Sequence, residues 1–199
     1  MIAAMPPRQA QLRHSRQESR DRIVAAATEL VRHQSYGELS IGAVMERAGF
    51  GRTIFYRHFD DLGDLLIRAS RDAVEQLYAS QLPLAEASAS DPRDVVRQVA
   101  EQAVAAFERH GPLLRAVHEA AASDPDVAAG YSAMRRQFDG LVEQALRARG
   151  ARVDDVAETA RALNLLNEAY LLDAFGRKPR VSTETAVQTV TEIWLGVVA

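Results

Sequence analysis

Four side chains that suit DNA recognition follow one another closely near residue 55. They are Arg52, Thr53, Tyr56 and Arg57. Arginine donates to guanine edges and to phosphates, and threonine and tyrosine hydroxyls donate to phosphate oxygens. On a helix running from about Arg52 to Phe59, the apolar Phe55 and Phe59 fall on the opposite side. The segment therefore predicts a helix with one face for the protein and one face for DNA.

A second short helix is expected immediately before this one. Its apolar positions recur three and four residues apart and are Ile41, Val44, Met45 and Ala48. Ser40 is a good N-cap, and Gly49 permits the backbone conformation that ends a helix. Two helices joined by a tight turn form a helix-turn-helix, which fits one helix into the major groove. We count Ser40 and His58 with the four residues above as the predicted DNA-binding set.

The amino-acid composition limits the class of protein, the number of domains and the compartment. The chain has 199 residues, 47% of them hydrophobic, which is enough for one large or two small domains with a real core. It has no cysteine, so disulfides, thiolate metal sites and a cysteine nucleophile are excluded. Neither a membrane-length apolar run nor a signal-peptide pattern is present, so a cytoplasmic location is expected.

Charge is distributed unevenly along the chain. The net charge is −3, yet residues 1–60 hold nine arginines against six acidic residues, while residues 61–199 hold fifteen basic against twenty-one acidic residues. A basic N-terminal part joined to an acidic remainder is typical of a protein with one DNA-facing end. Ordinary scatter in charge is the alternative explanation.

Helical periodicity continues to the end of the chain and predicts an all-α protein of nine helices. We expect a flexible arm over residues 1–15, a helix-turn-helix DNA-binding domain over 16–60, a linking helix over 61–80, and a ligand-binding and dimerisation domain over 81–199. The small-residue segment 81–90, interrupted by Pro83, is the expected boundary. Gly111-Pro112 is expected to break a helix that Asp91-Pro92 begins, and Asp124-Pro125 begins another.

The segment A-G-F-G-R-T-I-F-Y-R-H-F, residues 48–59, resembles the recognition motif of the TetR family of bacterial transcriptional regulators. The resemblance implies an all-helical homodimeric repressor whose recognition helix places Arg52 at a variable base-reading position. Three positions depart from the family pattern: Gly51 and Ile54 replace hydroxyl residues that cap the helix or contact phosphate, and Gly63 stands near a usual lysine. These departures predict fewer DNA-backbone contacts.

The C-terminal stretch from residue 162 to 176, with the later segment E-I-W-L-G-V-V, resembles the ethionamide-resistance regulator subgroup of that family. In this subgroup two asparagines and a tryptophan face an apolar ligand tunnel, and Asn164, Asn167 and Trp194 match them. Further large side chains expected to line the tunnel are Phe107, Tyr131, Met134, Phe138 and Tyr170. A structural hydrogen bond across a helix interface remains the alternative for each asparagine, because a buried amide needs a partner.

The last two helices carry broad apolar faces, as the final one shows with Val187, Val190, Ile193, Trp194, Val197 and Val198. Resemblance to the family implies that these helices form a dimer, and the alternative is that they only cover the core. The histidines show no metal-ligand spacing, and His118-Glu119 has no accompanying nucleophile, so we predict no metal, no cofactor and no catalytic residue.

The predicted function is therefore that of a repressor that binds palindromic operator DNA as a dimer and is released by a small apolar effector. A small helical enzyme, or a protein-interaction module that binds no DNA, is the alternative. Leu65, Leu66 and Leu77 on the linking helix are expected to transmit the effector's influence between the domains.

Overall fold

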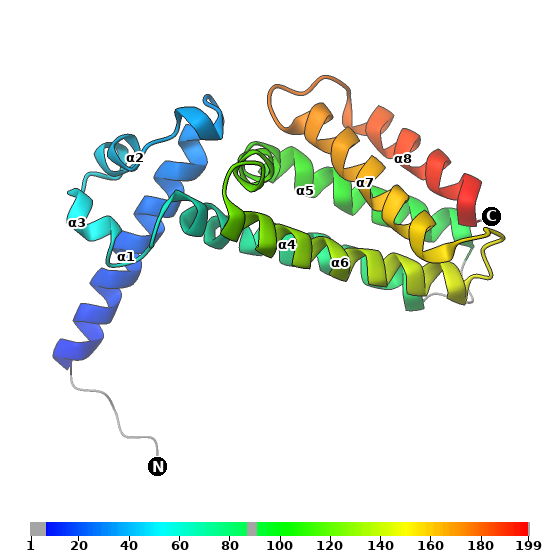
Figure 1. Ribbon diagram of the computed structural model, residues 1–199, viewed down its shortest axis with the longest axis horizontal. Helices are drawn as coiled ribbons and strands as arrows, with labels where there is room; N and C mark the ends of the chain where they lie inside the picture. The colour runs from blue at the N-terminus through cyan, green and yellow to red at the C-terminus, as the bar shows by residue number, and fades with distance from the viewer. Residues whose placement is uncertain (1–6, 87–90, 199) are drawn as a thin grey trace, which may run out of the picture.

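The computed structural model describes residues 7–86 and 91–198, and every regular element in these ranges is helical. Figure 1 shows a smaller lobe formed by α1, α2 and α3, beside an elongated bundle formed by α4 to α8. The predicted all-α class is confirmed, with eight α-helices in the described ranges instead of nine. None of the helices in these ranges is long and apolar enough to cross a membrane.

The N-terminal lobe is built from three α-helices and one turn of 3-10 helix. They are α1 (Pro7–Leu30), η1 (Tyr36–Glu38), α2 (Ile41–Ala48) and α3 (Arg52–Phe55). Of the arm predicted for residues 1–15, residues 1–6 lie outside the described residues, and residues 7–15 form the first turns of α1. The flexibility of this segment stays a prediction. Ile23, Ala27 and Val31 of this first segment are fully buried, because helical spacing brings them to the side that α2 covers.

The helix α4 (Leu62–Glu86) joins the two lobes. Asp61 caps it, since its Oδ1 accepts a hydrogen bond from the Asp64 N–H at 2.8 Å. The helix was expected to end at residue 80, with a domain boundary over residues 81–90, but it continues to Glu86. Residues 87–90 lie outside the described residues. The helix continues through Pro83 because the next residue, Leu84, is buried in the bundle core, which offsets the hydrogen bond that proline cannot donate.

Four helices complete the bundle. They are α5 (Pro92–Ala121), α6 (Pro125–Ala148), α7 (Val156–Phe175) and α8 (Thr183–Val198). Each begins after a residue whose side-chain oxygen accepts a hydrogen bond from a backbone N–H of the first turn, and these caps are Asp91, Asp124, Asp155 and Ser182. The helix starts predicted from Asp91-Pro92 and Asp124-Pro125 are confirmed.

Gly111-Pro112 does not break a helix, which is why eight helices are present where nine were predicted. A Cβ atom at Gly111 would overlap the backbone carbonyl of Phe175, so the glycine allows the end of α7 to pack directly on α5. Leu113 and Ala116 just beyond it are buried, and this packing keeps the helix continuous despite the missing donor of Pro112.

Two hydrophobic cores hold the molecule together, and they do not divide at the lobe boundary. The first occupies the bundle and includes Val104, Leu146 and Leu171. The second joins α1, α2 and α3 to Leu65 and Leu66 of α4 and to the last turns of α5. The DNA-facing lobe is therefore packed on α4 and α5 through apolar side chains.

Candidate functional site

The helix-turn-helix has the local geometry that its sequence predicts. Ser40 Oγ accepts a hydrogen bond from the Ala43 N–H at 3.1 Å, and Gly49 adopts the left-handed conformation with φ of 74°. Phe55 and Phe59 are fully buried, with their ring centroids 5.6 Å apart. These anchors fix the orientation of the recognition segment on α1 and α2.

The recognition helix is shorter than predicted. It ends at Phe55 instead of Phe59, and residues 56–58 form turns. Gly51 precedes it without a side-chain cap, which agrees with the expected loss of a cap at this position. The Phe59 N–H still donates to the Phe55 carbonyl at 3.0 Å, so both phenylalanines face the core.

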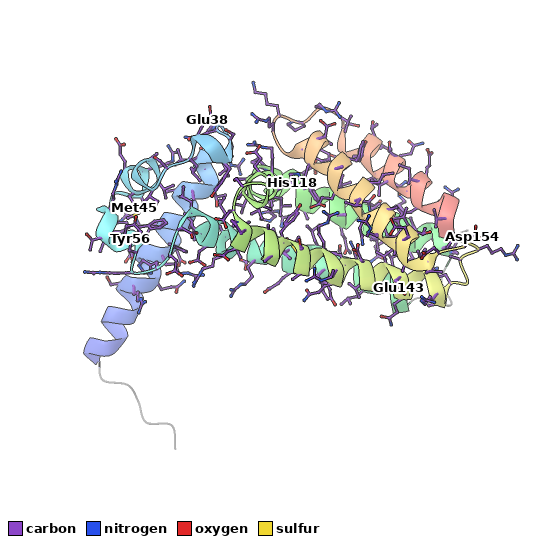
Figure 2. The ribbon with its side chains drawn as sticks, viewed as in Figure 1. Glu38, Met45, Tyr56, His118, Glu143 and Asp154 are labelled. Atoms are coloured by element: carbon purple, nitrogen blue, oxygen red, sulfur yellow. The ribbon has the colours of Figure 1, made fainter. Side chains whose placement is uncertain are left out.

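The four polar residues around residue 55 lie on the surface together. Arg52, Thr53, Tyr56 and Arg57 are all exposed, and the side chain of Tyr56 is 62% accessible. Figure 2 shows Tyr56 at the outer side of the α3 turn, away from the bundle. Ser40 is also exposed, and because its oxygen acts as acceptor in the cap, its O–H can still donate to a phosphate.

His58 occupies a different position from the other predicted DNA contacts. Its Nε2 lies 2.8 Å from the Ser19 hydroxyl of α1, and the side chain is half-buried. Burial lowers the pKa of His58, and the nearby Arg16, Arg20 and Arg57 lower it further. A neutral His58 therefore fixes α1 against the recognition turn.

Three arginines of α1, Arg16, Arg20 and Arg22, were not among the predicted DNA contacts. Arg16 donates to the Arg57 carbonyl at 3.0 Å, and Arg22 donates to the Ala48 carbonyl at 2.7 Å. Arg16 and Arg20 add positive charge beside Arg57, so the basic surface extends from α3 onto α1. Their spacing of four residues on an otherwise exposed helix face could have indicated this extension.

A cavity of about 450 Å³ lies in the bundle between α4, α5, α6 and α7. Five of the residues predicted from the sequence line it: Phe107, Tyr131, Met134, Phe138 and Asn164. Tyr78 of α4 packs edge-on against Phe138, with 5.7 Å between ring centroids. The cavity is thus enclosed mainly by apolar side chains with a few polar groups among them, as is usual for small-molecule sites.

Asn167 and Trp194 do not line this cavity. The indole Nε1–H of Trp194 donates to Asn167 Oδ1 at 3.0 Å, and Trp194 is buried in the bundle core. Positions three apart on a helix differ by about 60° in direction, so Asn164 faces α6 while Asn167 faces α8. The structure therefore favours the structural hydrogen bond as the role of Asn167. Tyr170 also packs against the bundle core and is absent from the cavity lining.

One half-buried carboxylate of the cavity, that of Glu168, was not among the predicted site residues. Glu168 accepts a hydrogen bond from the Tyr131 hydroxyl, and the Arg135 Nε lies 3.6 Å from its Oε2. Burial raises the pKa of Glu168 to about 7. The Tyr131 hydroxyl also lies 2.9 Å from His118 Nδ1, so a chain of polar contacts runs from the cavity to α5 (Figure 2 labels His118 at the side of the bundle that meets the small lobe).

Arg115 connects the bundle to the N-terminal lobe. Its buried guanidinium donates to the Val31 carbonyl at 3.0 Å and to the Gln34 carbonyl at 3.1 Å, both just after α1. It also donates to the Gly176 carbonyl at the end of α7 at 2.7 Å and pairs with Glu119 at 2.5 Å. Since α7 carries Asn164 and Glu168, this side chain connects a helix of the cavity with the DNA-facing lobe.

Residues 23–69 match the family described as bacterial regulatory proteins, tetR family, and residues 96–198 match the C-terminal domain of the transcriptional regulator EthR. The chain therefore belongs to the TetR family of bacterial transcriptional regulators, and its C-terminal half is of the EthR type. The proteins it resembles are regulators and not enzymes.

Individual relatives support the same assignment. The chain is 29% identical over 180 residues to the HTH-type transcriptional regulator EthR of Mycobacterium tuberculosis, covering 87% of this chain and 83% of that one. Among solved structures, the TetR family regulator PfmR of Thermus thermophilus is similar with a TM-score of 0.72 and 21% identity, over 89% of this chain and 98% of that chain. NalD of Pseudomonas aeruginosa, a repressor of a multidrug efflux pump, has a TM-score of 0.70 and 21% identity over 92% and 98%.

Proposed function

We propose that the chain is a dimeric repressor that binds a palindromic operator through its N-terminal lobe and releases it when a small, largely apolar effector fills the bundle cavity. The observation that carries this proposal is that α4 belongs to both sites. Leu65 and Leu66 at its start are buried in the core of the DNA-facing lobe, and Ile67, Val74 and Leu77 further along line the cavity. A ligand that displaces α4 therefore acts directly on the helix-turn-helix.

The proposed DNA interface consists of the exposed residues of the recognition turn. Arg52 and Thr53 are at the start of α3, where they can reach base edges, and Tyr56, Arg57 and Ser40 can donate to phosphates. Arg16 and Arg20 extend this surface on α1. His58 contributes by holding α1 and the turn together through Ser19.

The absence of a lysine near residue 63 has a structural reason. A Cβ atom at Gly63 would lie 2.6 Å from Val127 Cγ2 and 2.9 Å from Asp124 Oδ2, so the starts of α4 and α6 pack too closely for any side chain. The contact with the DNA backbone that a lysine makes at this position in relatives is thus replaced by close packing of α4 on α6. We propose that the arginines of α1 supply part of the missing phosphate binding.

Dimerisation is proposed to use α7 and α8. Val187, Val190 and Trp194 of the predicted apolar stripe are buried in the chain's own core, and the Val198 side chain lies outside the described residues. Leu166 of α7 is 41% accessible, and Ile193 and Leu195 of α8 are half-buried. This surface would bring two recognition turns to adjacent half-sites, about 34 Å apart on DNA. Such a regulator acts in the cytoplasm, where operator DNA lies.

Transmission of the effector signal is a shift between two conformations, one with high and one with low operator affinity. We propose two connections for it: α4, through Leu65, Leu66 and Leu77, and α7, through Arg115 and the end of α1. An effector lowers operator affinity by as much as its affinity differs between the two conformations.

The experiment that tests the DNA-binding part measures binding to the DNA upstream of the chain's own gene by fluorescence anisotropy over a series of salt concentrations. Affinity should fall steeply with salt because phosphate contacts release counterions. Replacing Tyr56 and Arg57 together by alanine should weaken binding at least about 30-fold, as two good contacts contribute roughly 1 to 3 kcal/mol each. Arg97→Ala, a distant exposed change on α5, is the matched control. Binding that ignores salt, or survives the double substitution in a folded protein, would contradict the proposal.

A further inference from the structure

We propose that the effector carries a protonated amine nitrogen on an apolar body, and that Glu168 is the residue that receives this positive charge. The inference rests on the proposed function of the bundle cavity as the effector site. It adds the chemical class of the ligand, which none of the relatives' names states.

The polar groups of the cavity lie at successive levels along its length. On α7 and α6, Glu168 is opposite Arg135 and Asn164 is opposite Asp139, with Asn164 Nδ2 donating to Asp139 Oδ1 at 2.8 Å. Four residues along a helix correspond to about 6 Å, so these two levels are about 6 Å apart. Glu168 is at the level nearer the DNA-facing lobe, because its partner Tyr131 also meets His118 there.

The negative charge of the Glu168 carboxylate is only partly compensated by the neighbouring side chains. It accepts one hydrogen bond from Tyr131 and forms an ion pair with Arg135, but the Arg135 Nε is 3.6 Å away, which is too far for a hydrogen bond. Burial raises the pKa of this carboxyl group to about 7 in spite of both neighbours. A ligand cation placed against the carboxylate would supply the missing compensation, and its effect is larger in the apolar cavity than in water.

The other polar groups of the cavity also favour a ligand that brings hydrogen-bond donors. Gln81 Oε1 is a buried acceptor without a hydrogen-bond partner, and Gln81 lines the cavity. The charged residues of the lining are Arg71 and Glu75 on α4, Arg135 and Asp139 on α6, and Glu168 on α7, so acidic groups outnumber basic ones. An anionic ligand would meet this excess of negative charge and leave the acceptor of Gln81 unpaired.

Space for the apolar body lies beyond the proposed charge site. Phe107, Met134 and Phe138 enclose the same cavity, and its volume of about 450 Å³ can hold a chain of about ten carbons with a compact head group. A lipophilic amine thus fits the cavity in both charge and shape.

Two probes that differ mainly in charge test the proposal: decylammonium and decanol, each titrated calorimetrically into the whole chain below its self-association concentration. At pH 8 the wild-type protein should bind the cation at least about tenfold more tightly, since one well-compensated buried charge contributes more than about 1.4 kcal/mol. Equal or tighter binding of decanol would overturn the proposal, and this comparison needs no variant.

The pH dependence of the affinity for the cation identifies the residue that recognises its charge. A group with a pKa of about 7 is about one-tenth ionised at pH 6 and nine-tenths at pH 8, so affinity for the cation should rise about tenfold across this range while that for decanol stays level. Glu168→Gln should remove both the rise and the preference for the cation, with decanol affinity retained as evidence of an intact cavity. Glu101→Gln, an exposed change on α5 outside the cavity lining, is the matched control and should keep both.

The role of His118 must be separated from that of Glu168, because its imidazole contacts the same Tyr131 hydroxyl. His118→Asn should keep the rise in cation affinity. A rise that survives Glu168→Gln, or that disappears in His118→Asn, would assign the charge recognition elsewhere and overturn the proposal.

Displacement of operator DNA distinguishes this inference from the proposed function. If decanol displaces the operator and the cation binds no better than decanol, the effector function stands and the charge proposal fails. If the cation binds through Glu168 without changing operator affinity, the charge site stands and the effector function fails.

Discussion

The recognition turn and the bundle cavity place their polar side chains in opposite ways. In the turn, Arg52, Thr53, Tyr56 and Arg57 point to solvent over a core that is wholly apolar. In the cavity, Glu168 and Gln81 point inward and are only partly paired. The turn exposes its polar side chains to solvent, where they can bind a large charged partner such as DNA. The cavity contains polar groups whose missing hydrogen bonds a small ligand can supply. A regulator needs both kinds of surface, and Arg115 and α4 connect them.

The largest expected effect is on the free energy of unfolding, which should distinguish the buried face of the turn from its exposed face. Phe55→Ala should lower the free energy of unfolding by about 3 to 5 kcal/mol, because a fully buried ring leaves a cavity in the core. Tyr56→Ala, one residue away but 62% accessible, should change it by no more than about 0.5 kcal/mol. Urea denaturation of both variants measures the difference. Similar losses of stability would show that Tyr56 is part of the core and not of the DNA-binding face.

The next effect concerns the connection between the two regions. Arg115→Met should cost about 3 kcal/mol, since it removes a buried cation, takes the nearest charge partner from Glu119 and leaves buried carbonyls without a donor. Arg177→Met is the matched control: Arg177 also lies near Glu119, at 3.8 Å, but its side chain is 64% exposed and the pair should contribute at most about 1 kcal/mol.

The same two variants test whether Arg115 transmits the effector signal. At a temperature where both are folded, Arg115→Met should reduce the factor by which a bound ligand lowers operator affinity, and Arg177→Met should leave that factor unchanged. Unaltered coupling in Arg115→Met would leave α4 as the proposed connection.

A smaller effect is expected from titration of the cavity. Because the folded-state pKa of Glu168 is raised to about 7, the folded protein holds a proton that the unfolded chain releases above about pH 4.5. This contribution is complete below pH 4.5 and is lost as pH rises through 7. Glu168→Gln should therefore gain about 2 to 3 kcal/mol of stability relative to wild type between pH 4.5 and pH 8. Thermal melts of both proteins across this range would show it, and parallel curves would contradict it.

The smallest effect separates the two asparagines of α7. Asn167→Leu should cost about 1 to 3 kcal/mol, because the buried Trp194 indole N–H loses its acceptor. It should leave ligand affinity unchanged, whereas Asn164→Leu should alter ligand affinity, since Asn164 lines the cavity. Calorimetry with decanol checks both variants, and a loss of binding in Asn167→Leu alone would reverse their proposed roles.

Much of the recognition turn could be predicted because its determinants lie within a few residues of one another. The Ser40 cap, the left-handed Gly49 and the buried Phe55 and Phe59 are local features, and the structure confirms them. The extent of the helix was predicted less well: it ends at Phe55, and residues 56–58 form turns before Phe59 packs into the core.

The cavity depends on packing between distant segments, and the sequence predicted it only in part. Apolar spacing and resemblance indicated Phe107, Met134, Phe138 and Asn164, yet the direction of Asn167 and Trp194 depends on which neighbour each helix face meets. Gly111-Pro112 and Pro83 read as helix breaks, but tertiary packing keeps both helices continuous. Glu168 and Arg115 look like ordinary charged helix residues, and only the fold buries them.

The central claim is that the cavity and the operator-binding surface are energetically coupled, and linkage provides its most direct test. The operator affinity of the wild-type protein would be measured with and without saturating decylammonium, and the affinity for the same ligand with and without saturating operator DNA. If the two sites are coupled, both affinities fall by the same factor, about 5-fold to 150-fold. Ligand binding that is equally tight on free and operator-bound protein would contradict it.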